Sequence, residues 1–150
     1  MELTNLTLAE QAELLRQGQC SSREIVDAHL ARIGRLDGNL HAYVEVYAGE
    51  ARQLADGADR ARAAGLPLGP LHGLPICLKD LCDIGGRIGT IGSRMWADRR
   101  ATATSATVER LLAAGMIPLG KTHMVEFAFG AWGTNPLMGA PWNPWDSARQ

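Results

Sequence analysis

Two short apolar runs decide the fold of this sequence, Leu74-Pro75-Ile76-Cys77-Leu78 and Met116-Ile117-Pro118-Leu119. Each run is too short for a helix and is bounded by glycine or proline, a pattern that predicts a buried strand. A helical apolar pattern from Ala106 to Ala114 lies between them and ends at Gly115. Because strand, helix and strand follow one another, we expect a parallel α/β unit with both faces covered.

The chain changes composition near residue 66. All seven prolines lie at position 67 or beyond, whereas the earlier residues carry helical patterns. We therefore expect an amino-terminal helical segment over residues 1–65 and the start of an α/β core over residues 66–150. Within the first segment, residues 42–46 alternate between apolar and polar side chains like a short strand.

The amino-terminal segment contains clear signals for helix starts and stops. Thr7-Leu8-Ala9-Glu10 and Ser21-Ser22-Arg23-Glu24 are capping boxes, in which a hydroxyl and a carboxylate satisfy the free amides at a helix start. We expect the first helix to end at Gly18 and the second before Asp37-Gly38-Asn39. A third, solvated helix is expected over residues 48–64.

The composition is that of an ordinary soluble globular domain. Of the 150 residues, 46% are hydrophobic and 21% are charged, and the formal net charge is -1. No apolar run approaches the roughly 20 residues of a membrane span, and Met1-Glu2-Leu3-Thr4 does not resemble a signal peptide. A charge near zero favours neither nucleic acid nor anionic lipid, so we expect no membrane and no direct nucleic-acid partner.

The three cysteines are Cys20, Cys77 and Cys82. An odd number in a chain of this size predicts reduced thiols and a cytoplasmic location. Cys77 and Cys82 lack the second pair, or the nearby histidine, that would complete a tetrahedral metal site. We therefore expect neither a metal nor another cofactor.

Only two of the 15 basic residues are lysines, Lys79 and Lys121, and each closely follows one of the apolar runs. A buried lysine, unlike an arginine, can lose its proton at physiological pH, although a lysine at a strand end usually reaches out to solvent. Lys121 also lies in Gly115–Thr122, which matches the phosphate-binding pattern G-x-x-x-x-G-K-T. A working loop of this kind follows a strand, whereas here a helical pattern precedes it and its four intervening residues are bulky and apolar. A nucleotide-binding module that uses Lys121 is the alternative interpretation.

The expected sheet is too small to stand alone. Two or three strands do not make an independently stable parallel sheet. Trp132, Trp142 and Trp145 lie in Gly- and Pro-rich loop sequence with no periodic element to pack against. We infer an amino-terminal part of a larger α/β domain, and we predict that the isolated chain is partly unfolded or self-associates.

The stretch Gly69-Pro70-Leu71-His72-Gly73-Leu74-Pro75-Ile76-Cys77-Leu78-Lys79-Asp80 resembles the amidase signature family, which includes bacterial amidases and the A subunit of glutamyl-tRNA(Gln) amidotransferase. Further motifs recur in the family's order, namely Gly92-Ser93, Ala106-Thr107-Val108, Ala113-Ala114-Gly115, residues 120–130 and Asn143-Pro144-Trp145-Asp146. The resemblance spans nearly the whole chain. It implies roughly the amino-terminal third of an α/β/α fold with a mixed sheet, incomplete in this chain.

The resemblance implies hydrolysis or transfer of a small-molecule amide by a Ser–cis-Ser–Lys triad. Lys79 matches the family's catalytic lysine, which must be a neutral amine to draw a proton, through the bridging serine, from the nucleophilic serine. Burial behind the first apolar run would have to lower its pKa. The attacked carbonyl would pass through an acyl-enzyme whose oxyanion is held by backbone amides. The implied partners of the full-length protein are a second copy or other amidotransferase subunits.

The two serines of the triad are not identified in this sequence. In the family they come from a Gly/Ser-rich loop shortly after the motif at residues 143–146, and the sequence stops at Gln150, before such a loop. None of the serines present lies in a Gly-Gly-Ser-Ser context, and we assign the nucleophile to none of them (Ser21, Ser22, Ser93, Ser105 and Ser147). We expect the chain alone to be inactive.

Two positions depart from the family's pattern. His123 stands where asparagine is common, and Ser105 stands where aspartate is frequent. His123 and Met124 are the candidates for a substrate pocket, although a buried methionine more often fills a core.

Overall fold

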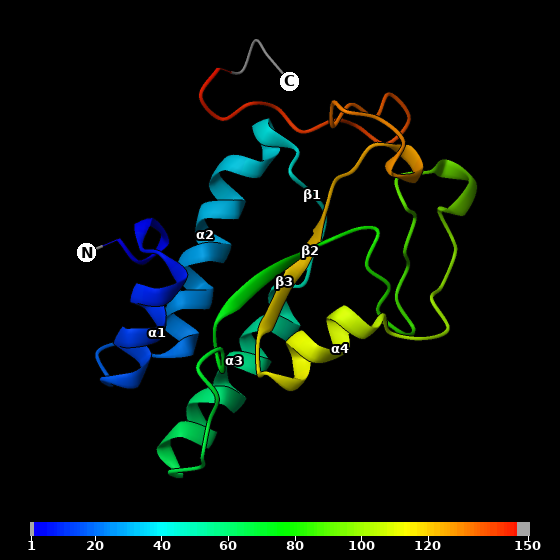
Figure 1. Cartoon of the computed structure of the whole chain (residues 1–150). Helices are drawn as coiled ribbons and strands as arrows, with labels where there is room; N and C mark the ends of the chain where they lie inside the picture. Colours follow the sequence, from blue (N-terminus) through cyan, green and yellow to red (C-terminus); the bar gives the residue numbers. More distant parts are fainter. Residues whose placement is uncertain (1, 147–150) are drawn as a thin grey trace. The chain divides into compact units, whose positions relative to one another are not determined.

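The computed structural model describes residues 2–146 (Figure 1). In chain order the elements are the 3-10 turn η1 (Leu3–Asn5), α1 (Leu8–Arg16), α2 (Ser22–Leu40), β1 (Tyr43–Val46), α3 (Ala48–Ala63), β2 (Pro75–Lys79), η2 (Arg94–Trp96), α4 (Ala106–Ala113), β3 (Ile117–Thr122) and η3 (Glu126–Ala128). Ser147 lies outside the described residues. Among the described residues, none of the helices is long and apolar enough to cross a bilayer.

The three strands form one mixed sheet in the order β1-β3-β2 (Figure 1). β1 pairs with β3 in antiparallel register, with Tyr43 opposite Thr122. β2 runs parallel to β3, because Leu74 bonds to Ile117 at one end and Asp80 bonds to Thr122 at the other. The expected strand–helix–strand unit is confirmed, with α4 in the connection between β2 and β3, and the α/β class with a mixed sheet is confirmed with it.

β3 extends further than the apolar run that predicted it. It continues through Gly120 and Lys121 to Thr122, and its first five residues are all buried. Gly120 permits the close approach of β1, because a Cβ atom at this position would lie 2.2 Å from the carbonyl oxygen of Glu45. The strand therefore carries a buried lysine that hydrophobicity alone did not indicate.

Both predicted capping boxes are present. The Thr7 hydroxyl accepts from the Glu10 amide, the Glu10 carboxylate accepts from the Thr7 amide, and Ser21 and Glu24 repeat the arrangement. The Glu10 carboxylate takes a pKa below its usual value because it accepts these Thr7 hydrogen bonds.

The predicted end of α2 is wrong. The helix continues through Asp37-Gly38-Asn39 to Leu40. The next residue, His41, has a left-handed backbone conformation with φ of 50°. The Asp37 carboxylate accepts from the amides of Ala42 at 2.7 Å and Tyr43 at 3.2 Å. These bonds satisfy the backbone amides of the two residues that follow His41. The helix therefore ends without a glycine in the left-handed conformation, and Gly38 lies inside it.

The chain divides into two compact units that interleave along the sequence. Unit 1 comprises residues 2–35, 47–76 and 111–119, and unit 2 comprises residues 36–46, 77–110 and 120–146 among those described. Neither unit coincides with residues 1–65 or 66–150, because α2, α4, β2 and β3 each contribute residues to both units.

Unit 1 contains two hydrophobic clusters. In the first, α2 and the alanine face of α3 pack on β3, and its buried residues are Val26, Leu30, Ala51, Ala55, Ala58, Ile117 and Leu119. The second contains Leu15 of α1 with Ile25, Leu74 and Met116. The alanines at i, i+4 and i+7 explain how the charged α3 sequence still presents a buried face.

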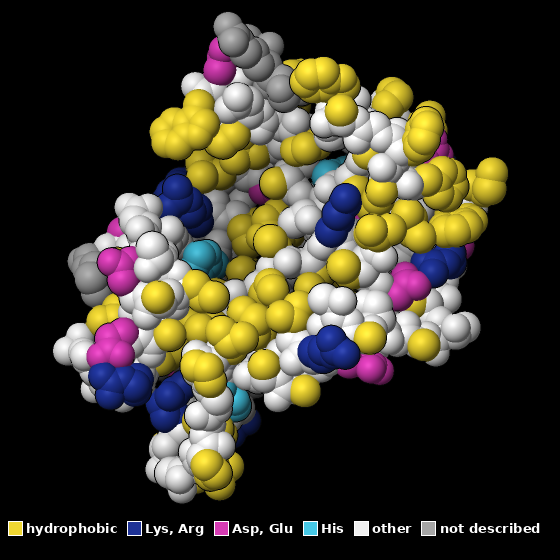
Figure 2. All heavy atoms as spheres, in the orientation of Figure 1, with side chains coloured by type: hydrophobic (Ala, Val, Ile, Leu, Met, Phe, Trp, Pro, Cys, Tyr) yellow, Lys and Arg dark blue, Asp and Glu magenta, His cyan; other side chains and the backbone are white. Residues whose placement is uncertain are grey.

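Unit 2 leaves large aromatic side chains exposed. The exposed fractions are 91% for Phe129, 78% for Trp132 and 95% for Trp145. Hydrophobic side chains also gather over the loops that follow β3 in the space-filling view (Figure 2). Of the three tryptophans that were expected to lack packing partners, Trp132 and Trp145 are largely exposed among the described residues, whereas Trp142 is 36% exposed.

Candidate functional site

Lys79 is the last residue of β2, and its side chain is exposed. Because successive side chains on a strand alternate between faces, the buried Leu78 and Asp80 lie on the opposite face. Directly after the strand, the amide of Cys82 donates to the carbonyl of Lys79 at 2.8 Å in a tight turn. The burial that we expected around Lys79 is absent among residues 2–146.

His123 and Met124 directly follow β3, at the same sheet edge as Lys79. The amide of Asp80 donates to the carbonyl of Thr122 at 3.1 Å, which places the carboxyl ends of β2 and β3 side by side. The edge beyond the carboxyl ends of parallel strands is where α/β sheets commonly bind ligands. The three predicted site residues therefore come from two adjacent strand ends.

His123 and Met124 differ in their surroundings. Met124 is 3% exposed, so its side chain packs in the interior of unit 2. His123 is half-buried, and its Nδ1 atom is buried without a hydrogen-bond partner among the described residues. Burial lowers the pKa of His123, while the nearby Asp37 carboxylate acts in the opposite direction.

The buried lysine of the sheet is Lys121. Its side chain is 1% exposed, and its Nζ atom lies 3.1 Å from Oδ1 of Asp80, whose side chain is 3% exposed. The nucleotide-binding alternative required a loop over residues 115–122 with free backbone amides and an available lysine. Residues 117–122 instead form β3, and Lys121 pairs with Asp80, so the geometry gives that alternative no support.

Asp80 and Thr90 are parts of this site that were not predicted from the sequence. Oδ2 of Asp80 accepts from the backbone amide of Thr90 at 3.1 Å and from its hydroxyl. A signal for Asp80 was present, because an aspartate directly after a buried strand needs a partner. Any of the 15 basic residues was a candidate for that partner, and nothing in the local sequence pointed to Lys121 or Thr90.

A second charged pair lies in the same unit. Arg99 donates to both carboxylate oxygens of Asp83, at 3.0 and 2.5 Å, and also to the carbonyl of Gly89 at 2.8 Å. The Arg99 guanidinium holds the pKa of Asp83 below its usual value. The carbonyl of Asp83 in turn accepts from the amide of Ser105 at 3.0 Å.

Ser93 and Ser105 each lie directly before a helical element. Ser93 is 1% exposed and its hydroxyl accepts from the amide of Met95 at the start of η2. The Ser105 hydroxyl, just before α4, is buried without a hydrogen-bond partner within residues 2–146. No group of three or more His, Cys, Asp or Glu side chains in the part of the chain described here is arranged to hold a metal ion.

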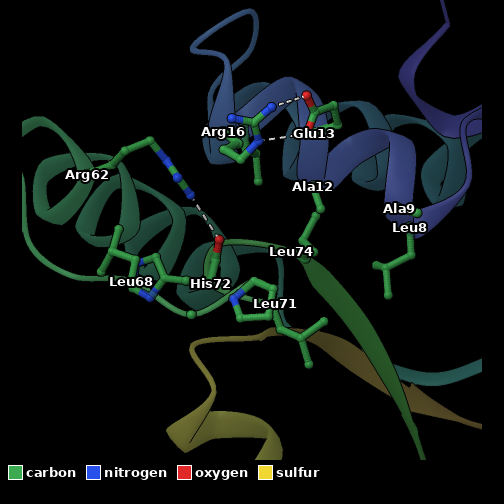
Figure 3. Close-up of a pocket in the computed structure, with 13 residues that line it drawn as sticks. Leu8, Ala9, Ala12, Glu13, Arg16, Arg62, Leu68, Leu71, His72 and Leu74 are labelled. Carbon is green, nitrogen blue, oxygen red and sulfur yellow. Dashed lines mark hydrogen bonds and ion pairs between the residues drawn. The ribbon is translucent and has the colours of Figure 1, made fainter.

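A cavity of about 790 Å³ opens in unit 1 between α1 and the loop before β2 (Figure 3). Its walls are mainly apolar, formed by Leu8, Ala9, Ala12, Leu15, Leu68, Leu71 and Leu74. Arg62 lies on one side and donates to the carbonyl of His72 at 3.0 Å, while Arg16 pairs with Glu13 on α1. The cavity contains none of the three predicted site residues.

A cavity of about 520 Å³ lies in unit 2 and is lined by His41, Thr134, Asn135, Pro136, Gly139, Ala140 and Trp142. Asn135 is 1% exposed and donates to the carbonyl of Met124 at 3.0 Å. A Cβ atom at Gly139 would lie 3.8 Å from Cε1 of His123. The cavity is therefore adjacent to the two residues predicted for a substrate pocket, although neither of them lines it.

A family model described as Amidase matches residues 24–150, which is most of the chain. Together with the α/β fold and the motifs around Lys79, this match places the chain in the amidase signature family. The chain is 43% identical over 148 residues to the A subunit of glutamyl-tRNA(Gln) amidotransferase from Salinispora arenicola (strain CNS-205). It is also 43% identical over 149 residues to the protein of the same name from Synechococcus sp. (strain CC9605). In both cases the match covers 99% of this chain and 30% of the relative.

Solved structures show the same fold. One describes an unexpected vestigial protein complex that reveals the evolutionary origins of an s-triazine catabolic enzyme. It matches with a TM-score of 0.90 and 37% identity over 95% of this chain and 31% of its own. A bacterial aryl acylamidase of the amidase signature family matches with a TM-score of 0.87 and 30% identity, over 94% of this chain and 30% of its own. This chain thus spans about a third of the length of the proteins it matches.

Proposed function

We propose that this chain supplies the lysine of an amide-cleaving site, with Lys79 as the base of a Ser–cis-Ser–Lys triad. The observation that carries the proposal is the position of Lys79 at the carboxyl end of β2, within a family match that covers residues 24–150. Relatives and structural neighbours that bear amidase and amidotransferase names support the same reaction class.

The base must be neutral when it takes the proton. In the proposed reaction the nucleophilic serine attacks the amide carbonyl while its proton passes through the bridging serine to Nζ of Lys79. The amide nitrogen leaves as ammonia or amine once it has received a proton, and a second nucleophile then releases the acyl group. Because water favours the charged form of the amine, the exposed Lys79 side chain needs a covering surface before it can act as a neutral base. The match covers 30% of the relative, and the rest of the relative's chain is available to supply such a surface.

We further propose a small amide as substrate and other amidotransferase subunits as partners. The support is the name shared by the curated relatives, each of them the A subunit of a glutamyl-tRNA(Gln) amidotransferase. A cytoplasmic location is part of the same proposal and agrees with the three free cysteines, since free thiols persist in reducing compartments.

A hybrid chain tests the proposal. The hybrid joins residues 1–150 to the part of the Salinispora arenicola relative that lies beyond the matched region, and ammonia release from glutamine is measured with and without the other subunits of that amidotransferase. The intact relative serves as the positive control. We expect the hybrid to release ammonia and Lys79→Ala to lower the rate by about 10²- to 10⁴-fold.

The isolated chain provides the complementary experiment. We expect purified residues 1–150 to release no more ammonia than their own Lys79→Ala variant. A folded but inactive hybrid, or a hybrid whose Lys79→Ala variant keeps its rate, contradicts the proposal.

A further inference from the structure

A buried polar network begins at Asp80, the residue after Lys79. The Asp80 residue is 2% exposed, and its two carboxylate oxygens face different segments. Oδ1 accepts from Nζ of Lys121 at 3.1 Å, and Oδ2 accepts from the amide and the hydroxyl of Thr90. The Asp80 side chain, directly after β2, thus binds both Lys121 of β3 and Thr90 of the loop that follows β2.

Backbone bonds on both sides of Lys79 complete the attachment. The amide of Asp80 donates to the carbonyl of Thr122 at 3.1 Å, and the Thr122 hydroxyl donates to the carbonyl of Leu78 at 3.5 Å. Leu78 and Asp80 are buried, whereas Lys79 between them is exposed. The backbone of Lys79 is therefore held through its two neighbours while its own side chain stays free to reach a partner.

The network continues to the second predicted part of the site. The hydroxyl of Thr90 accepts from the amide of Gly92 at 3.0 Å. Asn135 then donates its side-chain amide to the carbonyl of Gly92 at 2.6 Å and to that of Met124 at 3.0 Å. A Cβ atom at Gly92 would lie 2.9 Å from the carbonyl oxygen of Met124, so these segments approach closely. The contacts run without a break from beside Lys79 to Met124.

Stability alone is a weak explanation for such a network. A buried ion pair often contributes no more than a well-packed apolar pair of the same volume, because both charges lose their water. The value of a fully bonded polar network lies rather in the single geometry that it specifies. The members of this network flank both strand ends from which the predicted site residues come.

We infer that Asp80, held by Lys121 and Thr90, is a positioning residue that fixes the backbone of Lys79 against the segment that carries Met124. This inference rests on the proposed role of Lys79 as the base. A base displaced by about 1 Å loses on the order of 10²-fold in rate, so the network acts on the chemical step rather than on substrate binding. Asp80 itself touches neither the substrate nor the reacting atoms in this role.

Thr90 offers the sharpest substitution. Thr90→Val keeps the shape of the side chain but removes the hydroxyl that binds Asp80 and Gly92, whereas Thr90→Ser restores that hydroxyl. In the hybrid chain we expect Thr90→Val to lower kcat by about 10- to 100-fold with KM within about twofold. We expect Thr90→Ser to recover kcat to within about threefold of the parent. Asp98→Asn, which removes an exposed acid in the same unit, is the matched control and leaves both constants unchanged.

A spectroscopic measurement on the hybrid chain needs no turnover. Because residues 1–150 contain only two lysines, labelling this segment alone with ¹⁵N-lysine before it is ligated to the rest of the hybrid gives two backbone amide signals, one from Lys79 and one from Lys121. We expect Thr90→Val to move both signals, Thr90→Ser to return them, and Asp98→Asn to move neither. A network that serves Lys121 alone would move one signal and leave that of Lys79 in place.

The outcomes separate the two proposals. An unshifted Lys79 amide signal in Thr90→Val, or a hybrid in which this variant keeps its kcat, overturns the positioning role while leaving Lys79 as the base. A hybrid that stays active as Lys79→Ala overturns the proposed function, whatever the two amide signals do.

Discussion

Replacing Lys121 by methionine tests how much stability is lost when one partner of the buried Lys121–Asp80 ion pair is removed. Lys121→Met removes the ammonium group and leaves the Asp80 carboxylate, whose side chain is 3% exposed, in the interior. Breaking a buried pair in this way typically costs about 3–5 kcal/mol. Because Oδ2 of Asp80 keeps both of its bonds to Thr90, we expect a loss near the lower end of that range, about 3 kcal/mol.

The expected loss is large enough to measure. The melting is measured on the hybrid chain, because the isolated chain is predicted to be partly unfolded or to self-associate, and a loss of about 3 kcal/mol should lower the melting temperature of Lys121→Met clearly below that of the parent hybrid. The double variant Asp80→Asn with Lys121→Met removes both charges, and we expect it to melt closer to the parent than Lys121→Met alone. Thermal unfolding followed by circular dichroism, at two protein concentrations to detect association, gives the midpoints of the parent, of Asp80→Asn and Lys121→Met alone, and of the double variant.

A surface ion pair supplies the matched control. Arg16→Met breaks the pair with Glu13, in which the side chains are 71% and 46% exposed, so its melting temperature should fall much less than that of Lys121→Met. The reasoning is refuted if Lys121→Met melts within about 1 °C of the parent, or if the losses of its two single variants simply add in the double variant.

Three further predictions follow from the same contacts. Burial lowers the pKa of both His29 and His123, so the unfolded state binds more protons than the folded state, and stability should be full above about pH 6.5 and fall below it. Urea midpoints at pH 5 and pH 7.5 measure this loss, and replacing both histidines by glutamine should reduce it. Gly120→Ala should lower the melting temperature because its Cβ atom meets a β1 carbonyl, whereas Gly38→Ala, in a helix with open space around it, should raise it slightly. Trp132→Ser should shift the isolated chain toward monomer in light scattering, and an unchanged size distribution in a self-associating parent contradicts this.

The local elements could be predicted from the sequence because their signals are local. The capping boxes at Thr7 and Ser21 place two helix starts, and the two apolar runs place β2 and β3. The end of α2 could not be predicted in the same way. It depends on a side-chain bond from Asp37 to amides further along the chain and on the left-handed conformation of His41, which glycine-based rules do not anticipate.

The candidate site was predictable only in part, for a related reason. Its family motif and the scarcity of lysine single out Lys79 and Lys121. Which of them is buried depends on the pairing of β2 with β3 and on the fold of the loop at Thr90, and both are long-range contacts. Within residues 2–146 the buried lysine is Lys121, which pairs with Asp80, whereas Lys79 is exposed, so the burial of Lys79 in the completed enzyme stays a prediction.

The most direct test of the account compares two replacements of Lys79 in the hybrid chain. Arginine keeps the positive charge and nearly the same reach but cannot act as a neutral base, whereas alanine removes both properties. If Lys79 acts as the base, glutamine hydrolysis by Lys79→Arg should fall about as far as that by Lys79→Ala, by about 10²- to 10⁴-fold. If Lys79→Arg keeps a rate within about threefold of the hybrid, the lysine contributes only its charge and the account is wrong.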